Sequence, residues 1–339
     1  MEKVAEKSKF KFPTEVVELP SKGLIYPKDN PLSSGKIEMK YMTAREEDIL
    51  TNQNYIQKGI VLDKLIESLI VSKVNIKDII VGDKNAILIA SRVLGYGKDY
   101  TFKSYSRKTN KIEDFTIDLT TLKDKILNKK DLIEVGVNEF DFKLPHTKGN
   151  ITYKILTHGD EIAIDKEVQG QNKIKPNSNP EVTTRLKYMI TSVEGDRDKK
   201  TIRDFVDNYL LARDAKSLRD EIRRVSPDVD LTYTGTDGEE DVTVPISIHF
   251  FGLSPEYRQN LFSQIHEIVF HGKGGYDFHT VYNMPIWLRN FTFKKLEEHY
   301  KKEQEIINKQ SNTLKNSKEI ARPNINPSKT YNANIAKKT

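Results

Sequence analysis

Residues 35–47 read GKIEMKYMTAREE, and residues 149–161 read GNITYKILTHGDE. Both stretches contain a glycine, an isoleucine two residues later, a lysine, two apolar residues, a threonine and a closing pair of acids. The apolar residues before the threonine alternate with polar ones, which predicts a half-buried strand. The threonine and the acid three residues later form the capping-box pattern that begins a helix. The sequence therefore predicts one strand-to-helix unit that is used twice.

A second pair of segments repeats in the same order. DKNAI at 83–87 and DAKSL at 214–218 each end five residues before an arginine, Arg92 and Arg223. The copies are 114 residues apart for the first motif and 131 for the second, and the polar stretch 168–181 supplies most of the difference. Two ordered matches separated by one loop-like insertion indicate an internal duplication. The alternative is chance similarity between two examples of a common strand-to-helix junction.

The predicted fold class is α+β. We expect two tandem related modules, each with a strand that leads into a capped helix, a small helical layer and a β-hairpin, followed by a helical C-terminal segment and flanked by extended termini. The expected divisions are an extended N-terminal arm (1–34), a first repeat (35–136), a second repeat (137–246), a helical C-terminal segment (247–309) and a basic extended tail (310–339).

Composition narrows the possible classes of protein. The chain has 339 residues and a formal net charge of +6. Seven basic residues and one acid lie from Asn308 onward, so the rest of the chain is neutral. A neutral body is unlike the broad basic footprint of a DNA-binding domain. The chain contains no cysteine, which excludes disulfides and thiolate metal sites. No apolar run is long enough for a transmembrane helix, and the first residues lack a signal-peptide pattern, so we expect no membrane partner.

The sequence offers no set of residues that would carry catalysis. His266-Glu267 is followed by a histidine at 271, one position later than the zinc-protease spacing requires. The acids at the two helix starts are of the kind that helix N-termini attract in any protein. We therefore expect a protein that is not an enzyme and that needs no cofactor and no metal.

Residues that could bind a partner protein lie in the two ends and in the last helix. Trp287 and Arg289 are residue types that interfaces favour, although this helix could equally pack on its own domain. The extended arm must lie either on its own body or on a neighbour to be ordered. The candidates for partner binding are Phe10, Phe12, Tyr26, Trp287, Arg289, Phe291, Arg322 and Tyr331.

Several of these motifs also suggest a family. LPSKG at 19–23 with the strand-to-helix unit after it, the segment 144–161, the segment 214–219 and Asn-Met-Pro at 283–285 resemble the baseplate hub and hub-assembly proteins of T-even-type contractile-tailed bacteriophages. The resemblance spans roughly residues 15–305. Such relatives often carry Cys-x-x-Cys pairs in their hairpins, and this chain has none, so no zinc site is carried over.

The resemblance implies a structural or assembly role in the hub region of a phage tail baseplate. The expected partners are hub, tube or tape-measure proteins, bound through the modules and the extended termini, with several copies per particle. The expected location is the virion tail, after synthesis and assembly in the host cytoplasm. Two alternatives stay open: a nucleic-acid-binding adaptor that uses the basic tail and the hairpin loop 103–111, and a transient assembly chaperone that is absent from the mature particle.

Overall fold

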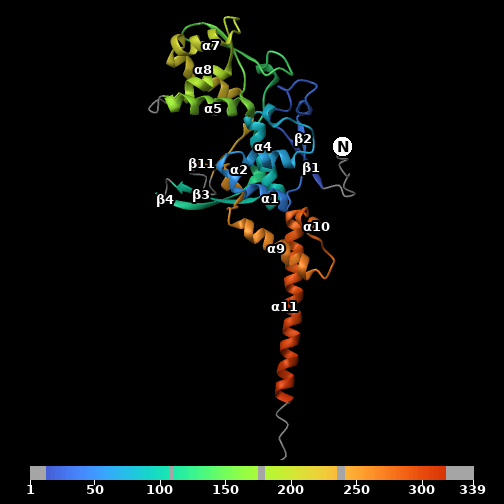
Figure 1. The fold of residues 1–339 in the computed structure, drawn as a ribbon. Coiled ribbons are helices and arrows are strands. Elements are labelled where there is room, and N and C mark those ends of the chain that lie inside the picture. The colour runs from blue at the N-terminus through green and yellow to red at the C-terminus, as the bar shows by residue number, and fades with distance from the viewer. Residues whose placement is uncertain (1–12, 107–109, 175–179, 235–240, 318–339) are drawn as a thin grey trace, which may run out of the picture.

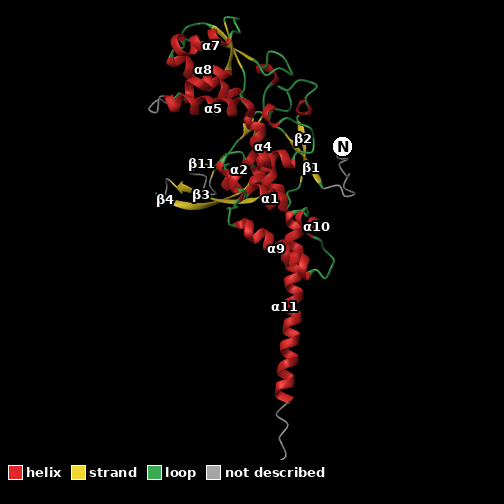
Figure 2. Cartoon of the chain, in the orientation of Figure 1, coloured by secondary structure: helices red, strands yellow, loops and turns green. Residues whose placement is uncertain are grey.

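The computed structural model describes residues 13–106, 110–174, 180–234 and 241–317. These residues form helices together with small antiparallel sheets, one of three strands and four of two strands. Figure 1 shows three groups of elements along the length of the molecule, and Figure 2 shows that helices dominate each group. The predicted α+β class is confirmed.

The first module comprises residues 13–125. Its hairpin of β1 and β2 leads into helices α1 to α4, and a second hairpin, β3 with β4, follows them. Helix α3 buries an apolar stripe that recurs every three or four residues, which is why it packs as an amphipathic helix. The elements are β1 (Thr14–Glu18), η1 (Pro31–Ser34), β2 (Lys36–Lys40), α1 (Ala44–Leu50), α2 (Gln53–Gln57), α3 (Val61–Leu69), η2 (Ile76–Asp78), α4 (Val81–Tyr96), β3 (Asp99–Ser106), β4 (Lys111–Asp118), η3 (Leu119–Thr121) and β5 (Asp124–Lys125).

The described part of the predicted N-terminal arm belongs to this module. Strand β1 pairs with β2 along its whole length, from Thr14 opposite Lys40 to Glu18 opposite Lys36. Residues 19–34 then pack on the module, and Leu19 is buried in its core. Residues 13–34 of the predicted arm therefore lie on their own body, which is one of the two alternatives that the sequence left open. Residues 1–12 lie outside the described part of the chain.

The second module comprises residues 138–225 and follows a linker that contains η4 (Lys129–Asp131). Its three strands form one sheet in the order β6-β7-β8. The elements are β6 (Phe140–Lys143), β7 (Asn150–Tyr153), α5 (His158–Ile174), α6 (Glu181–Met189), β8 (Ile190–Val193), α7 (Lys199–Asp204), the single π-helical turn η5 (Phe205–Tyr209) and α8 (Ala212–Val225).

The segment that follows α8 returns to the first module. We call residues 226–251 the return segment, and it contains β9 (Asp228–Val229), β10 (Thr232–Thr234), β11 (Asp241–Thr243) and η6 (Ile248–Phe251). Strand β9 pairs with β5 of the first module. The ring of Phe250 lies 4.8 Å from that of Tyr100, edge to face. The expected second repeat therefore ends near residue 225, because its predicted hairpin packs on the first module instead.

The C-terminal body comprises residues 252–317. It contains α9 (Tyr257–His271), α10 (Phe278–Tyr282) and the long helix α11 (Ile286–Ser317). Leu261, Ile265 and Ile268 of α9 form a small core with Val281 of α10 and Ala44 of α1. Helix α11 extends well beyond α9 and α10 (Figure 1) and continues to Ser317, so the first residues of the expected extended tail are helical.

One large hydrophobic core runs through both modules and includes residues from Leu19 to Ile286. Because they share this core, the modules and the return segment pack against one another and are not separate domains. Among the described residues, no helix is both long and apolar enough to cross a lipid bilayer.

Candidate functional site

The junction between β2 and α1 is fixed by a group of buried polar side chains. The backbone N–H of Thr43 donates to Glu46 at 2.8 Å, and the Thr43 hydroxyl accepts from the N–H of Arg45 at 3.2 Å. Lys40 lies 2.9 Å from Glu46, and the Ser68 hydroxyl donates to the same carboxylate at 2.6 Å. The predicted capping box is therefore present, and it ties α1 to the preceding strand and to α3.

The junction between β7 and α5 has the same plan. The N–H of Thr157 donates to Asp160 at 3.0 Å, and the N–H of Asp160 donates back to the Thr157 hydroxyl at 3.3 Å. Lys154 lies 2.8 Å from Asp160. Lysine, threonine and acid thus occupy the same relative positions at both junctions, and they make the same contacts there.

The repeated aspartates have equivalent roles that the sequence did not reveal. Asp83 of α4 accepts hydrogen bonds from the N–H of Ser21 at 3.0 Å, from the Ser21 hydroxyl at 2.7 Å and from the Tyr26 hydroxyl at 2.7 Å. Asp214 of α8 accepts from the N–H of His146 at 2.8 Å and from the N–H and hydroxyl of Thr147 at 3.1 and 2.9 Å. Each aspartate therefore fastens a Leu-Pro turn to a helix, and we call each arrangement a latch.

The two latches also share their backbone geometry. Lys22 and Lys148, which follow the hydroxyl residue of each turn, both have positive φ, at 50° and 63°. Positive φ is uncommon for a residue with a side chain, so its occurrence at both positions is a specific similarity. Each lysine is followed by a glycine, Gly23 or Gly149.

The capping carboxylate Glu46 gives a prediction for pH. Burial alone would raise the pKa of Glu46, but the Lys40 charge and hydrogen bonds from Ser68 and Thr43 outweigh burial and lower that pKa. A lowered folded-state pKa adds stability that is present above the unfolded value, about 4.3, and is lost as the pH falls through the folded value.

We therefore expect Glu46→Gln to lower the free energy of unfolding by about 1–3 kcal/mol at neutral pH and to flatten its decline under acid conditions. Urea unfolding at a series of pH values measures both effects, and Glu134→Gln, at an exposed glutamate, is the control. An unchanged acid slope in Glu46→Gln would show that Glu46 does not contribute to it.

A second buried network joins the C-terminal body to the first module. Arg289 of α11 and Glu47 of α1 are both fully buried and form an ion pair. The Glu47 carboxylate also accepts from the hydroxyls of Tyr257 at 3.0 Å and Tyr96 at 3.2 Å, and Arg289 donates to Gln264 at 2.8 Å. Burial, reinforced by the Glu47 charge, raises the pKa of Tyr257 to about 12. The joint between α1, α4, α9 and α11 is therefore a polar cluster with a fully buried ion pair at its centre and part-buried hydrogen bonds around it.

The matching acid of the second module has a different partner. Glu161 occupies the position of Glu47 and forms two parallel hydrogen bonds with Arg185 of α6, at 2.8 and 2.6 Å. This pair is part-buried and lies within one module. The same sequence position thus anchors the C-terminal body in the first module and an internal helix in the second.

The structure separates the partner-binding candidates into three groups. Trp287 and Phe291 are 58% and 55% exposed and lie one turn apart on α11, with the Lys295 ammonium 5.7 Å from the Phe291 ring centre. Tyr26 and Arg289 are buried in the latch and the joint described above, so the prediction that they bind a partner is corrected. The candidates that fall outside the described residues are Phe10, Phe12, Arg322 and Tyr331.

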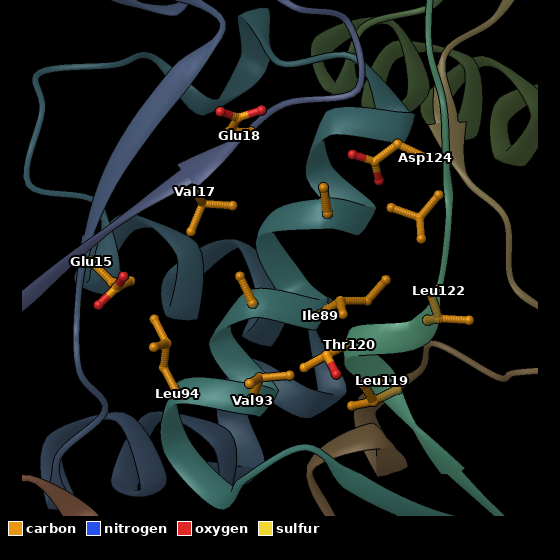
Figure 3. A pocket seen from close by; sticks show the side chains of 13 residues that line it. Glu15, Val17, Glu18, Ile89, Val93, Leu94, Leu119, Thr120, Leu122 and Asp124 are labelled. Carbon is orange, nitrogen blue, oxygen red and sulfur yellow. The ribbon is translucent and has the colours of Figure 1, made fainter.

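A hollow of about 290 Å³ lies between β1, α4 and η3. Figure 3 shows Val17, Ile89 and Val93 on its walls and the carboxylates of Glu18 and Asp124 at its rim. Glu18 is already paired with two lysines, which lower its pKa. Burial raises the pKa of Asp124. The hollow is thus a mainly aliphatic wall with two separate carboxylates at its rim.

Within the described ranges, histidine, aspartate and glutamate side chains form no group of three that could hold a metal ion. The Nε2 of His271, which the sequence places near a zinc-protease pattern, lies 3.0 Å from the carboxylate of Glu267 on the same helix. Comparison of the chain with protein-family models, with curated proteins and with solved structures found no match.

Proposed function

We propose that this chain is a structural or assembly component of a contractile phage tail baseplate and binds neighbouring tail proteins. The tail and the baseplate come from the sequence resemblance alone. The binding role is supported by exposed surfaces of the molecule.

The observation that carries the binding role is the exposed aromatic pair on α11. Trp287 and Phe291 present large apolar side chains to solvent from adjacent turns. Tryptophan and phenylalanine are enriched in the cores of protein interfaces. Their helix is fixed to the first module by the buried Arg289, so a partner would meet a preformed surface and little conformational entropy would be lost on binding.

The far half of α11 supports the same conclusion. Residues 301–310 are exposed to solvent, and they include the adjacent apolar residues Ile306 and Ile307. A helical segment of this length is marginally stable in water without a packing partner. A neighbouring protein that lies along α11 would bury both isoleucines and stabilise the helix.

We also infer that the two modules derive from one duplicated unit. The paired capping groups and the paired latches support this inference, because they recur in the same order and share part of their hydrogen bonds. In each junction the threonine N–H donates to the acid three residues later, and in each latch the N–H and the hydroxyl of Ser21 or Thr147 donate to the aspartate. A duplicated scaffold offers two similar faces to neighbouring subunits, which suits a fitting within a large assembly.

Replacing Trp287 and Phe291 together with alanine is expected to leave the free energy of unfolding within about 0.5 kcal/mol of the wild type, because both are surface residues. The same change should reduce incorporation into tails by roughly ten-fold or more, as loss of an interface anchor does. Quantitative mass spectrometry of purified tails measures incorporation.

The matched control is the double variant Tyr105→Ala with Ile112→Ala, which removes an equally exposed pair from the β3–β4 hairpin. Normal incorporation of the Trp287 and Phe291 variant would contradict the proposed binding surface. A chain found only in assembly intermediates would favour the transient chaperone. Salt-sensitive binding to DNA by the purified chain would favour the nucleic-acid adaptor.

A further inference from the structure

At two places, the residues that directly precede one helix (a helix-start segment) pack against the end of a strand that leads into a threonine-capped helix (a capped junction). The capped junctions are those at Thr43 and Thr157. Ile80 directly precedes α4 and forms an antiparallel bridge with Thr157, and the N–H of His158 donates to the carbonyl of Ile79 at 2.8 Å. Pro285 directly precedes α11 and forms an antiparallel bridge with Thr43. In both cases the residue before a helix pairs with the threonine that caps another helix.

Docking buries the helix-start segment. Ile79 and Ile80 are 1% and 0% exposed, beneath the start of α5. The contact also contains a polar pair, because His158 lies 2.9 Å from Asp63 of the first module. The helix-start segment of the first module thus packs against the capped junction of the second module.

The second module has a segment equivalent to Ile79-Ile80. Asp83 is the third residue of α4, and Asp214 is the third residue of α8, and each forms the latch of its module. Counting back from the aspartates places Leu210-Leu211 at the position of Ile79-Ile80. The residues before the two helices also share an extended backbone, with ψ of 158° at Ile80 and 143° at Leu211.

This third helix-start segment is not covered. Leu211 is 51% exposed, and Tyr209 beside it is 64% exposed. The first-module equivalent of Leu211 is completely buried. Ile80 has a capped junction against it and also donates its N–H to the Tyr26 hydroxyl at 3.1 Å, whereas Leu211 faces solvent.

We propose that the segment 209–211 docks a partner protein by a junction of the same kind, a strand that ends in a threonine-capped helix. In the described part of the chain there are two such junctions, at Thr43 and Thr157, and both are occupied by segments of the chain itself. A second copy therefore has no free junction to offer, and the occupant is a different protein. The contact would combine a backbone bridge with burial of Leu211 and Tyr209.

This inference deepens the proposed function by naming a class of partner, and its test uses the purified chain alone. We define the open variant as Ile286→Asp with Arg289→Ala, which removes the buried ion pair and places a charge in the buried segment that covers Thr43. Release of the C-terminal body, checked by proteolysis near Gly252, frees the Thr43 junction to receive Leu211 of another copy.

In sedimentation velocity, we expect the wild type to be monomeric and the open variant to self-associate. Adding Leu211→Asp to the open variant should weaken this association by roughly 30-fold, as loss of an interface anchor does. Ile112→Asp, at an exposed aliphatic residue of the first module, is the matched control and should not weaken it. If the open variant fails to fold, Glu47→Gln with Ile286→Ala is the milder alternative. It weakens the same contact and places no new charge in the buried segment.

Three results would overturn the proposal. The first is an open variant that stays monomeric after release of its C-terminal body. The second is self-association that Leu211→Asp does not weaken. The third is a wild-type dimer that depends on Leu211, which would make a second copy the occupant. None of these results bears on incorporation into tails, so the proposed function would stand or fall separately.

Discussion

Replacing Arg289 with alanine is expected to lower the free energy of unfolding by about 3–5 kcal/mol, because it leaves the buried carboxylate of Glu47 without its counter-ion. Tyr257 and Tyr96 would still donate to that carboxylate, but hydroxyl donors do not neutralise its charge. Loss of the pair should also loosen the joint between the C-terminal body and the first module.

Urea unfolding and hydrogen exchange measure these two effects of the Arg289 variant. Faster exchange should be concentrated in α9, α10 and the first turns of α11, whereas the second module should be unchanged. Trp287→Ala is the control, since it removes an exposed side chain two positions away. A stability loss below about 1 kcal/mol would mean that the pair contributes little to the joint.

Replacing Asp83 with alanine is expected to cost about 3 kcal/mol or more, because Ser21 and Tyr26 would keep buried donors without an acceptor. Asp214→Ala should cost less, because His146 and Thr147, which lose their acceptor, are exposed and can bond to water instead. Thermal and urea unfolding of the two variants measures both costs. A loss for Asp214→Ala that equals or exceeds the loss for Asp83→Ala would contradict this difference.

The asparagine variants should differ from each other. Burial raises the pKa of Asp83 and outweighs its hydrogen bonds, so the charged form of Asp83 opposes folding. Burial also acts on Asp214, but hydrogen bonds from His146 and Thr147 outweigh it and lower the pKa of Asp214. At neutral pH, Asp214→Asn should therefore destabilise more than Asp83→Asn.

The signs of the two pH effects are opposite. Stability from Asp214 is present above its unfolded pKa and is lost as the pH falls through its folded pKa. The charged form of Asp83 lowers the free energy of unfolding, and this loss disappears as the pH falls through the raised pKa of Asp83. Equal destabilisation by the two asparagine variants at every pH would contradict this difference.

Local patterns in the sequence predicted the α+β class and both capped junctions. The capping boxes at Thr43 and Thr157 depend on residues three positions apart, so the chain alone specifies them. The repeat of Asp83 and Asp214 was visible as a motif, but its role required knowledge of a contact across more than 60 residues.

Long-range packing decided the features that the sequence did not predict. The return of β9 to β5 pairs residues about 100 positions apart, which no local pattern encodes, so the end of the second repeat was misplaced. Arg289 resembled an interface residue beside Trp287. Its spacing from Ile286 and Phe293 puts it on the inward face of α11, and that helical periodicity was the available signal for its burial.

We propose that this chain is a structural component that binds neighbouring tail proteins. The most direct test is an electron cryo-microscopy map of baseplates from a phage that carries the gene for this chain. We predict density for the chain in the hub region, with other proteins in contact with Trp287 and Phe291 and with segment 209–211. Absence of the chain from baseplates and from their assembly intermediates would contradict the claim.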